Sequence, residues 1–157
     1  MREITGNLWD HNNADSIICI TTNGFVKKNG EAVMGRGCAY EATQRIPGIA
    51  KRLGEWIITN GNVPCWLTTG LVTFPVKRVW WEKADLKLIE ESAAWLRAVA
   101  TETLPGHKFI LPRPGCGNGQ LAWADVKPLL LSLPDNVFVI DFAKNEGGQW
   151  AFHCDDV

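Results

Sequence analysis

The chain has 157 residues, a length that suits one compact core and is too short for two. Hydrophobic residues make up 46%, charged residues 21%, and the formal net charge is −1, as in an ordinary globular domain. This composition excludes a long disordered segment and a broad basic surface that would bind nucleic acid through its charge. We therefore expect a single domain over residues 1–157, a monomer, without sequence-specific nucleic-acid binding.

Neither a secretory leader nor an apolar run of membrane-spanning length is evident, so a cytoplasmic protein with no membrane partner is expected. The five cysteines are odd in number and form no CxxC pair, which favours reduced thiols over disulfides. No cysteine is spaced with another cysteine or a histidine as zinc ligands would be. We expect neither a metal nor an organic cofactor.

The first predicted elements are a strand and two helices. Residues 15–22 form a short continuous apolar run, which is typical of a strand covered on both faces. Helical patterns follow over residues 38–45 and 47–58, where Pro47 is acceptable in a first turn.

Two further apolar runs, residues 65–69 and 71–76, flank Gly70. They are expected to pair as a hairpin or to lie side by side near a sheet edge, because Pro75 cannot donate a ladder hydrogen bond. The clearest helix of the chain comes next, over residues 85–104, and Asp85 is its expected N-cap.

The last part of the chain returns to the sheet. Residues 108–112 and 136–142 read as buried strands around a helix over residues 123–134, in which Pro128 predicts a late start or an irregular turn. Residues 144–157 are expected to be a loop with one edge strand at most. The alternation of strands and helices predicts an α/β sandwich.

Glycine clusters follow two of the predicted strands: "TTNGFVKKNGEAVMGRGCA" continues from residues 15–22, and "GCGNGQLAW" continues from residues 108–112. In an open α/β sheet, ligands bind beyond the carboxyl ends of the strands, and glycine-rich loops there present N–H groups to anions. Simple turns are the alternative interpretation. Neither cluster fits the P-loop or dinucleotide fingerprint, so we predict that both loops clasp one ligand, with a diphosphate as the natural choice.

Five segments, "GNLWD", "DSIICITTNG", "GEAVMGRGCA", "TFPVK" and "LPRPGCGNGQLAWADVKPLL", together resemble the macro domain family of ADP-ribose-binding modules. Within it, the chain is most similar to bacterial and phage members near the ALC1-like ADP-ribosyl hydrolase branch. The resemblance covers residues 3–142, leaving 143–157 as a C-terminal tail. It implies a three-layer α/β/α sandwich with a mixed central sheet, and ADP-ribose or an ADP-ribosylated substrate as partner.

The resemblance also implies where the ligand lies. The distal ribose would be surrounded by Asn23, Gly35, Arg36 and Gly37, and Gly24 and Met34 of the same loop would also contact the ligand. The diphosphate would lie on the second loop, formed by Gly115, Cys116, Gly117, Asn118 and Gly119. Asn7 and Leu8 would lie at the adenine, where most members have aspartate in place of Asn7, and a neutral amide oxygen is the weaker acceptor. Phe142 would stack on the adenine, with a core position as the alternative.

The implied chemistry rests on Lys77, with Asn23 beside it. "TFPVK" places Lys77 at the end of the strand before the long helix, where the hydrolase branch has a lysine that attacks or polarises the anomeric carbon. A nucleophilic lysine must be partly neutral, which burial beside a cation such as Arg78 or Arg36 would favour. Lys83 is the second candidate.

One departure from the branch concerns Gly119, where some members carry an aspartate that works with the lysine. Other members, including antitoxins that strip ADP-ribose from thymidine bases in DNA, rely on the lysine without it. We therefore predict hydrolysis of an ADP-ribosyl linkage. The alternatives are a binding module without chemistry, and a phosphatase that acts on ADP-ribose 1''-phosphate through Asn23 and a loop-bound water.

Three other side chains near these motifs have simpler interpretations. Cys116 is expected to be a small apolar filler, because no histidine is near it in sequence to activate a thiolate. Trp80 and Trp81 would wall the pocket, or one of the two would face the core.

Overall fold

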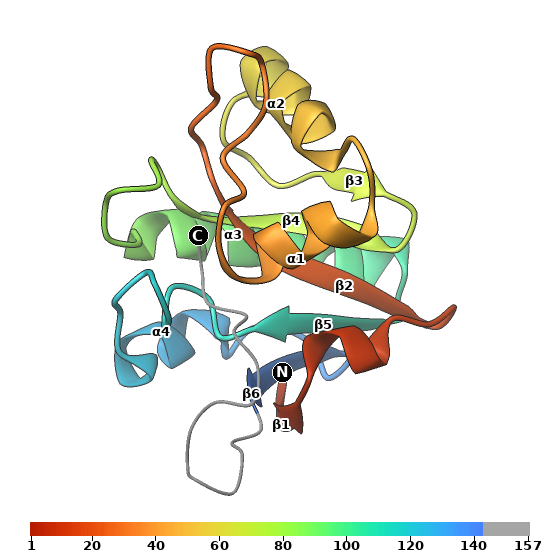
Figure 1. The fold of residues 1–157 in the computed structure, drawn as a ribbon. Coiled ribbons are helices and arrows are strands. Elements are labelled where there is room, and N and C mark those ends of the chain that lie inside the picture. The colour runs from red at the N-terminus through yellow and green to blue at the C-terminus, as the bar shows by residue number, and fades with distance from the viewer. Residues whose placement is uncertain (143–157) are drawn as a thin grey trace, which may run out of the picture.

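The computed structural model describes residues 1–142, so the predicted loop and edge strand of the tail lie outside the described residues. The chain forms a three-layer α/β/α sandwich around a mixed sheet, as the sequence predicts (Figure 1). In chain order the elements are β1 (Arg2–Gly6), the 3₁₀ helix η1 (Leu8–His11), β2 (Ser16–Asn23), α1 (Gly37–Arg45), α2 (Ile49–Asn60), β3 (Trp66–Thr68), β4 (Leu71–Lys77), α3 (Leu86–Ala98), the π-helical turn η2 (Val99–Thr103), β5 (Lys108–Pro112), α4 (Trp123–Leu130) and β6 (Val137–Phe142).

The sheet has six strands in the order β1-β6-β5-β2-β4-β3. β3 is antiparallel to β4, and all other neighbours are parallel, so the carboxyl ends of β1, β6, β5, β2 and β4 reach the same edge of the sheet. Pairing between β2 and β5 covers residues 16–18 and 108–110 and ends there. The two strands then diverge toward that edge (Figure 1).

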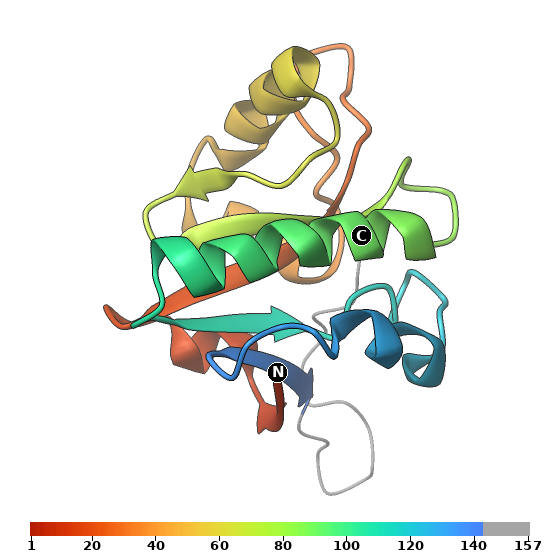
Figure 2. The ribbon, with the colours of Figure 1, turned by 180° about the vertical axis from the view of Figure 1, so that it is seen from behind.

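Helices cover both faces of the sheet. On one face, η1, α1 and α2 pack against apolar side chains that include Ile18 and Ile20. On the other, α3, η2 and α4 pack against side chains that include Phe74 and Phe109, and Figure 2 shows α3 and α4 in front of the sheet. Burial from both sides explains why β2 is a continuous apolar run, since all eight of its residues are buried.

The predicted hairpin is confirmed, with β3 at the sheet edge and β4 inside the sheet. Pro75 is tolerated within β4 because β3 pairs only as far as Val72. On the β3 side, the Thr73 N–H donates to the Cys65 carbonyl oxygen at 2.9 Å. Pro75, two residues on, faces the same side, where no strand requires its missing N–H.

The predicted helices are all present, with shifted ends. α2 begins at Ile49, so Pro47 precedes the helix and does not lie in its first turn. α4 begins at Trp123, accommodates Pro128 and ends at Leu130, four residues before the predicted end at Pro134. No helix within residues 1–142 is long and apolar enough to cross a membrane.

β1 is the one strand within residues 1–142 that is not among the predicted elements. This edge strand pairs in parallel with β6, but its side chains are exposed or half-buried, with Ile4 as its single large apolar residue. It therefore has no apolar run of the kind that identified the other parallel strands. The Glu3 carboxylate of β1 forms an ion pair with Lys127 of α4 at 2.8 Å.

Asp85 caps α3, as predicted. Its Oδ1 accepts the N–H groups of Lys87 at 2.9 Å and Leu88 at 3.4 Å, and its Oδ2 pairs with Arg78 Nε at 2.9 Å. Burial acts to raise the pKa of Asp85, but the hydrogen bonds from Arg78, Leu88 and Lys87 outweigh it and lower this pKa below its ordinary value.

Replacing Asp85 by alanine is expected to lower the free energy of unfolding by about 1 kcal/mol at neutral pH, because the helix loses its cap. The folded-state pKa is lowered, so the stabilisation is present above the ordinary aspartate pKa and is lost as the pH falls through the lowered value. Urea unfolding of wild type and Asp85→Ala at neutral and acidic pH measures both effects. Glu91→Ala, which removes an exposed carboxylate from the same helix, is the control, and an equal loss in both variants contradicts the assignment.

Candidate functional site

A cavity of about 350 Å³ opens at the carboxyl ends of β2 and β4. Its walls come from the loop after β2, the end of β4 with the loop that follows, and the glycine loop after β5. The lining residues are Val33, Gly35, Arg36, Lys77, Trp80, Trp81, Glu82, Asn118 and Gln120. The two glycine loops therefore meet at one cavity, and Lys77 lies in the same wall.

Lys77 is the last residue of β4, and it is only 3% exposed. Its Nζ donates to the Trp80 carbonyl oxygen at 3.4 Å, while Asn62 Nδ2 donates to the Lys77 carbonyl oxygen at 2.9 Å. Such deep burial of lysine is rare in proteins. Of the two predicted cationic neighbours, Arg36 lines the same cavity, whereas the Arg78 guanidinium pairs with Asp85.

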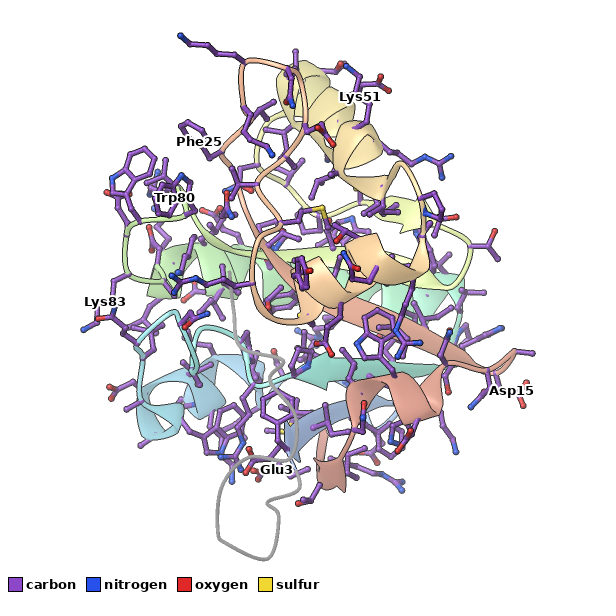
Figure 3. The ribbon with its side chains drawn as sticks, viewed as in Figure 1. Glu3, Asp15, Phe25, Lys51, Trp80 and Lys83 are labelled. Carbon is purple, nitrogen blue, oxygen red and sulfur yellow. The ribbon has the colours of Figure 1, made fainter. Side chains whose placement is uncertain are left out.

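The structure does not bring Lys83 to this cavity. Lys83 is exposed at the outer edge of the loop between β4 and α3, where it lines a separate surface hollow (Figure 3).

Asn23 fixes the first glycine loop to the end of β2. Its side chain is 1% exposed, its Nδ2 donates to the Val33 carbonyl oxygen at 3.0 Å, and its Oδ1 accepts the Phe25 N–H at 2.9 Å. The amide thereby joins both ends of the loop over residues 24–34. Met34, predicted to touch the ligand, lies in the core at 5% exposure.

Gly24 joins the two chain segments that leave β2 and β4. Its N–H donates to the Arg78 carbonyl oxygen at 3.1 Å. A Cβ at Gly24 would lie 2.7 Å from the Asn62 side chain and 2.9 Å from the Arg78 oxygen, so only glycine fits here. Sequence reasoning missed Asn62, because the "NGN" around it indicates a turn and says nothing of a contact with β4.

Helix α2 holds the same loop from outside. The Ala32 N–H donates to the Ala50 carbonyl oxygen at 2.9 Å, and Lys51 Nζ, on the outer side of α2 in Figure 3, donates to the Asn29 oxygen at 3.3 Å. A Cβ at Gly54 would lie 1.9 Å from the Gly30 carbonyl oxygen. Gly54 lies inside α2, and no pattern in the sequence indicates this close approach.

The first glycine loop ends in the start of α1. Gly35 is exposed in the cavity wall, and an added Cβ there would meet no atom within 4 Å. Gly37 has φ +61°, a left-handed conformation that glycine adopts without strain, and no side chain caps α1. The N–H groups of an uncapped first turn attract anions.

The second glycine loop is tightly folded. Gly115 has φ +75°, its carbonyl oxygen accepts the Leu121 N–H at 2.8 Å, and the Gly119 oxygen accepts the Ala84 N–H at 3.0 Å. Within residues 1–142, the backbone N–H groups of Asn118 and Gly119 form no hydrogen bond. They are donors of the kind that an anion nest requires.

Packing restricts which side chains fit at two positions in this loop. Cys116 packs against the core with its Sγ 3.5 Å from the Pro114 oxygen, as expected of a small apolar side chain. A Cβ at Gly119 would lie 2.6 Å from the Gly115 carbonyl oxygen and 2.8 Å from Ala84 Cβ. The loop as folded therefore has no room for the aspartate that some macro domains carry here.

The predicted adenine residues lie at the other end of the same sheet edge. Gly6, just before Asn7, pairs with Phe142 at the carboxyl ends of β1 and β6. Asn7 Oδ1 accepts the Trp9 N–H at 2.9 Å and caps η1. Leu8 is fully buried, so the prediction that it contacts the ligand is wrong for this conformation. Phe142 is half-buried against the core. β6 lies three strands from β4, and because β2 and β5 diverge between them, the separation at this edge exceeds three strand spacings, roughly 14 Å, which suits an elongated ligand.

Neither tryptophan of the adjacent pair faces the core. Trp80 is 49% exposed and Trp81 is 59% exposed, and both line the cavity. Gln120 also lines the cavity, and its φ of +63° is unusual for a residue other than glycine. No pattern in the sequence predicts this conformation. Cys19, Cys38 and Cys65 are buried as free thiols. Within residues 1–142, no three His, Cys, Asp or Glu side chains are placed to hold a metal.

No protein-family model and no curated protein sequence matches the chain. Several solved structures match it. The macrodomain of Mycobacterium tuberculosis DarG is 25% identical with a TM-score of 0.70, over 92% of this chain and 99% of that one. The macrodomain of Thermus aquaticus DarG is 24% identical with a TM-score of 0.66, over 90% and 97%. Thermosipho africanus DarTG in complex with ADP-ribose is 19% identical with a TM-score of 0.67, over 91% of this chain and 42% of that one.

The topology and the position of the cavity define an α/β/α protein with a cavity at the carboxyl ends of parallel strands, where ligands of open α/β sheets bind. The structural likenesses show, more specifically, that the chain has the macrodomain fold, which confirms the resemblance read from its motifs.

One glycine substitution in each loop is expected to show which of the two glycines the packing of the fold requires. Gly119→Ala should lower the free energy of unfolding by about 1–3 kcal/mol, because its methyl group collides with the Gly115 backbone. Gly35→Ala should change it by less than about 0.5 kcal/mol, because the added methyl enters open space. Urea unfolding of both variants measures the difference, and equal stabilities would show that the second loop is not packed as described.

Proposed function

We propose that this chain binds ADP-ribose along the strand ends, with the adenine near Asn7 and Phe142 and the distal ribose in the cavity beside Lys77. The diphosphate lies between them, on the N–H groups of Asn118 and Gly119 and the uncapped start of α1. The macrodomain fold supports this proposal, and so does the likeness to a structure that contains ADP-ribose.

We further propose that the chain hydrolyses an ADP-ribosyl linkage, with Lys77 acting at the anomeric carbon of the distal ribose. The observation that carries this proposal is the burial of Lys77 in the wall of the cavity where both glycine loops meet. A neutral amine there can attack that carbon while the electron pair of the broken bond departs with the released group. Water then hydrolyses the new carbon–nitrogen bond and restores the lysine.

Asn23 and Arg36 act differently in this scheme. Both polar ends of the Asn23 amide are bonded to the loop, so we assign it a positioning role. This argues against the phosphatase alternative, which needs the Asn23 side chain for a water. Arg36 lines the cavity as a permanent cation and favours the neutral form of a nearby lysine.

A binding module without chemistry is the second candidate function. The observation that favours it is the packing at Gly119, which leaves no room for the carboxylate that supports the lysine in some macro domains. Binding and turnover must therefore be measured separately.

Calorimetric titration is expected to show selective binding of ADP-ribose, with weaker binding of AMP, which lacks the distal ribose, and of NAD. Gly35→Ala should weaken ADP-ribose binding by at least about tenfold, or 1.4 kcal/mol, because its methyl group occupies the cavity without destabilising the fold. Wild-type affinity in this variant would place the distal ribose elsewhere.

Lys77→Ala is expected to abolish release of ADP-ribose from a panel of ADP-ribosylated protein, DNA and RNA while retaining ADP-ribose binding within about tenfold, or 1.4 kcal/mol. Lys77→Met, which fills the same buried space, shows whether a loss of turnover comes from the missing amine or from a packing defect. Lys83→Ala, on the loop that follows Lys77 and outside the cavity, is the matched control and should retain full turnover. If wild type and Lys77→Met turn over equally, Lys77 has no chemical role; if wild type only binds, the chain is a binding module.

A further inference from the structure

A second hollow, of about 530 Å³, lies at the amino ends of β2, β4 and β5, on the sheet edge opposite the Lys77 cavity. It is bordered by the loop that precedes β2, by β3 with its turn into β4, and by the segment between η2 and β5. Figure 3 shows Asp15, in the first of these segments, on the opposite side of the molecule from Trp80 and Lys83. Small-molecule sites have volumes of roughly 300–1,000 Å³. We call this space the amino-edge hollow.

Hydrogen bonds hold two walls of the amino-edge hollow in place. The turn from β3 into β4 is joined to β2, because the Gly70 carbonyl oxygen accepts the Ile18 N–H at 2.8 Å. The segment before β5 is joined to the start of β6, because Asn136 Nδ2 donates to the His107 carbonyl oxygen at 3.0 Å. Walls that are fixed before a ligand arrives lose little entropy when it binds.

Ser16 places a buried hydroxyl group in the wall of the hollow. The residue is 5% exposed, and its N–H donates to the Asn13 carbonyl oxygen at 3.2 Å. Its hydroxyl group forms no hydrogen bond with any residue of 1–142, and its oxygen is reached from the hollow. Buried polar groups nearly always have a hydrogen-bond partner. For the Ser16 hydroxyl, that partner must be a molecule inside the hollow.

Trp66 gives the same hollow an aromatic surface. It is the register partner of Val72, whose side chain packs in the core beneath α3, so Trp66 lies on that face of the sheet. The indole is 41% exposed and belongs to neither of the two buried clusters of the described chain. A tryptophan in such a position offers a flat face on which a ring-shaped ligand can stack.

The charge of the amino-edge hollow differs from that of the Lys77 cavity. Arg36, Lys77 and Glu82 line the Lys77 cavity, whereas none of the residues of 1–142 that line the hollow is Asp, Glu, Lys or Arg. Amide, hydroxyl and imidazole groups supply its polar lining, from Asn12, Asn13, Ser16, Thr68, Thr69 and His107. A charged ligand would lose water here without gaining an ion pair, so the lining favours an uncharged ligand.

We propose that the amino-edge hollow binds an uncharged ring compound that carries hydroxyl groups, with the ring on Trp66 and a hydroxyl group bonded to Ser16. Nucleosides and simple sugars share this chemistry. Their hydroxyl groups donate and accept hydrogen bonds, as do the amides and hydroxyls of the lining. The site lies at the other edge of the sheet from the proposed ADP-ribose site, and its existence does not depend on that proposal.

Titration with uridine and with glucose distinguishes the two sources of the ring. The backbone N–H signals of Thr69 and Gly70, which line the hollow, report its occupancy in two-dimensional NMR spectra. We expect one of the two compounds to shift these signals with a Kd of about 1 mM or tighter. Its phosphorylated form, UMP or glucose 6-phosphate, should bind no more tightly, because no lysine or arginine of residues 1–142 lines the hollow. An excess of ADP-ribose should leave the shift unchanged.

Three variants show whether the named groups hold the ligand. Trp66→Ala should weaken binding by at least about tenfold, or 1.4 kcal/mol, because the stacking face is lost. Ser16→Ala should weaken it about fivefold through the loss of one hydrogen bond. Its free energy of unfolding should stay the same, because the Ser16 hydroxyl bonds to no residue of the described chain. Trp80→Ala, at the opposite sheet edge, is the control and should bind as wild type does.

Three results overturn the proposal. The first is the absence of a shift with both neutral compounds. The second is tighter binding of the phosphorylated form, which requires a cationic site. The third is unchanged binding in Ser16→Ala and Trp66→Ala, which places the ligand elsewhere. If Trp66→Ala fails to fold, Ser16→Ala decides by itself, because it removes no contact within residues 1–142 that the hydroxyl group makes by hydrogen bonding.

Discussion

One backbone hydrogen bond, from the Gly24 N–H to the Arg78 carbonyl oxygen, joins the two chain segments at the point where they leave β2 and β4. It keeps Asn23 and Lys77, which are register partners at the last pairing of these strands, on neighbouring chain ends. Asn62 packs against this junction and bonds to the Lys77 backbone, so the lysine is held by main-chain contacts on either side. The loop that forms the cavity wall and the loop that carries the tryptophans both start here.

The sequence was informative wherever burial from both sides imposed a continuous apolar run, as in β2, β5 and β6. It also located both glycine loops, because parallel strands carry the residues after their last positions to one edge. Lys77 was identified only through the resemblance to macro domains, since a lysine at the end of a strand is usually an exposed surface group. β1 escaped detection because an exposed edge strand needs no apolar run. Gly54 and Asn62 escaped it because their importance lies in contacts with chain segments distant in sequence.

Asn23 illustrates why residue type and position at a strand end do not determine a role. An amide there can serve a ligand or the protein's own backbone, and the same pattern in the sequence describes both. Here the Val33 oxygen and the Phe25 N–H occupy its two ends, so the amide sets the shape of the loop. Leu8 is a similar case, since its side chain belongs to the core although it neighbours the predicted adenine site. Such residues act on a ligand by shaping the wall around it.

The packing around Gly119 has a consequence for how this loop can evolve. The atoms nearest a side chain at this position are the carbonyl oxygen and Cα of Gly115, which belong to the backbone and cannot be removed by substituting a side chain. A carboxylate at position 119 therefore requires the chain between residues 115 and 119 to follow a different path first. In this chain, a single substitution at position 119 therefore cannot introduce that carboxylate while the loop keeps its present path.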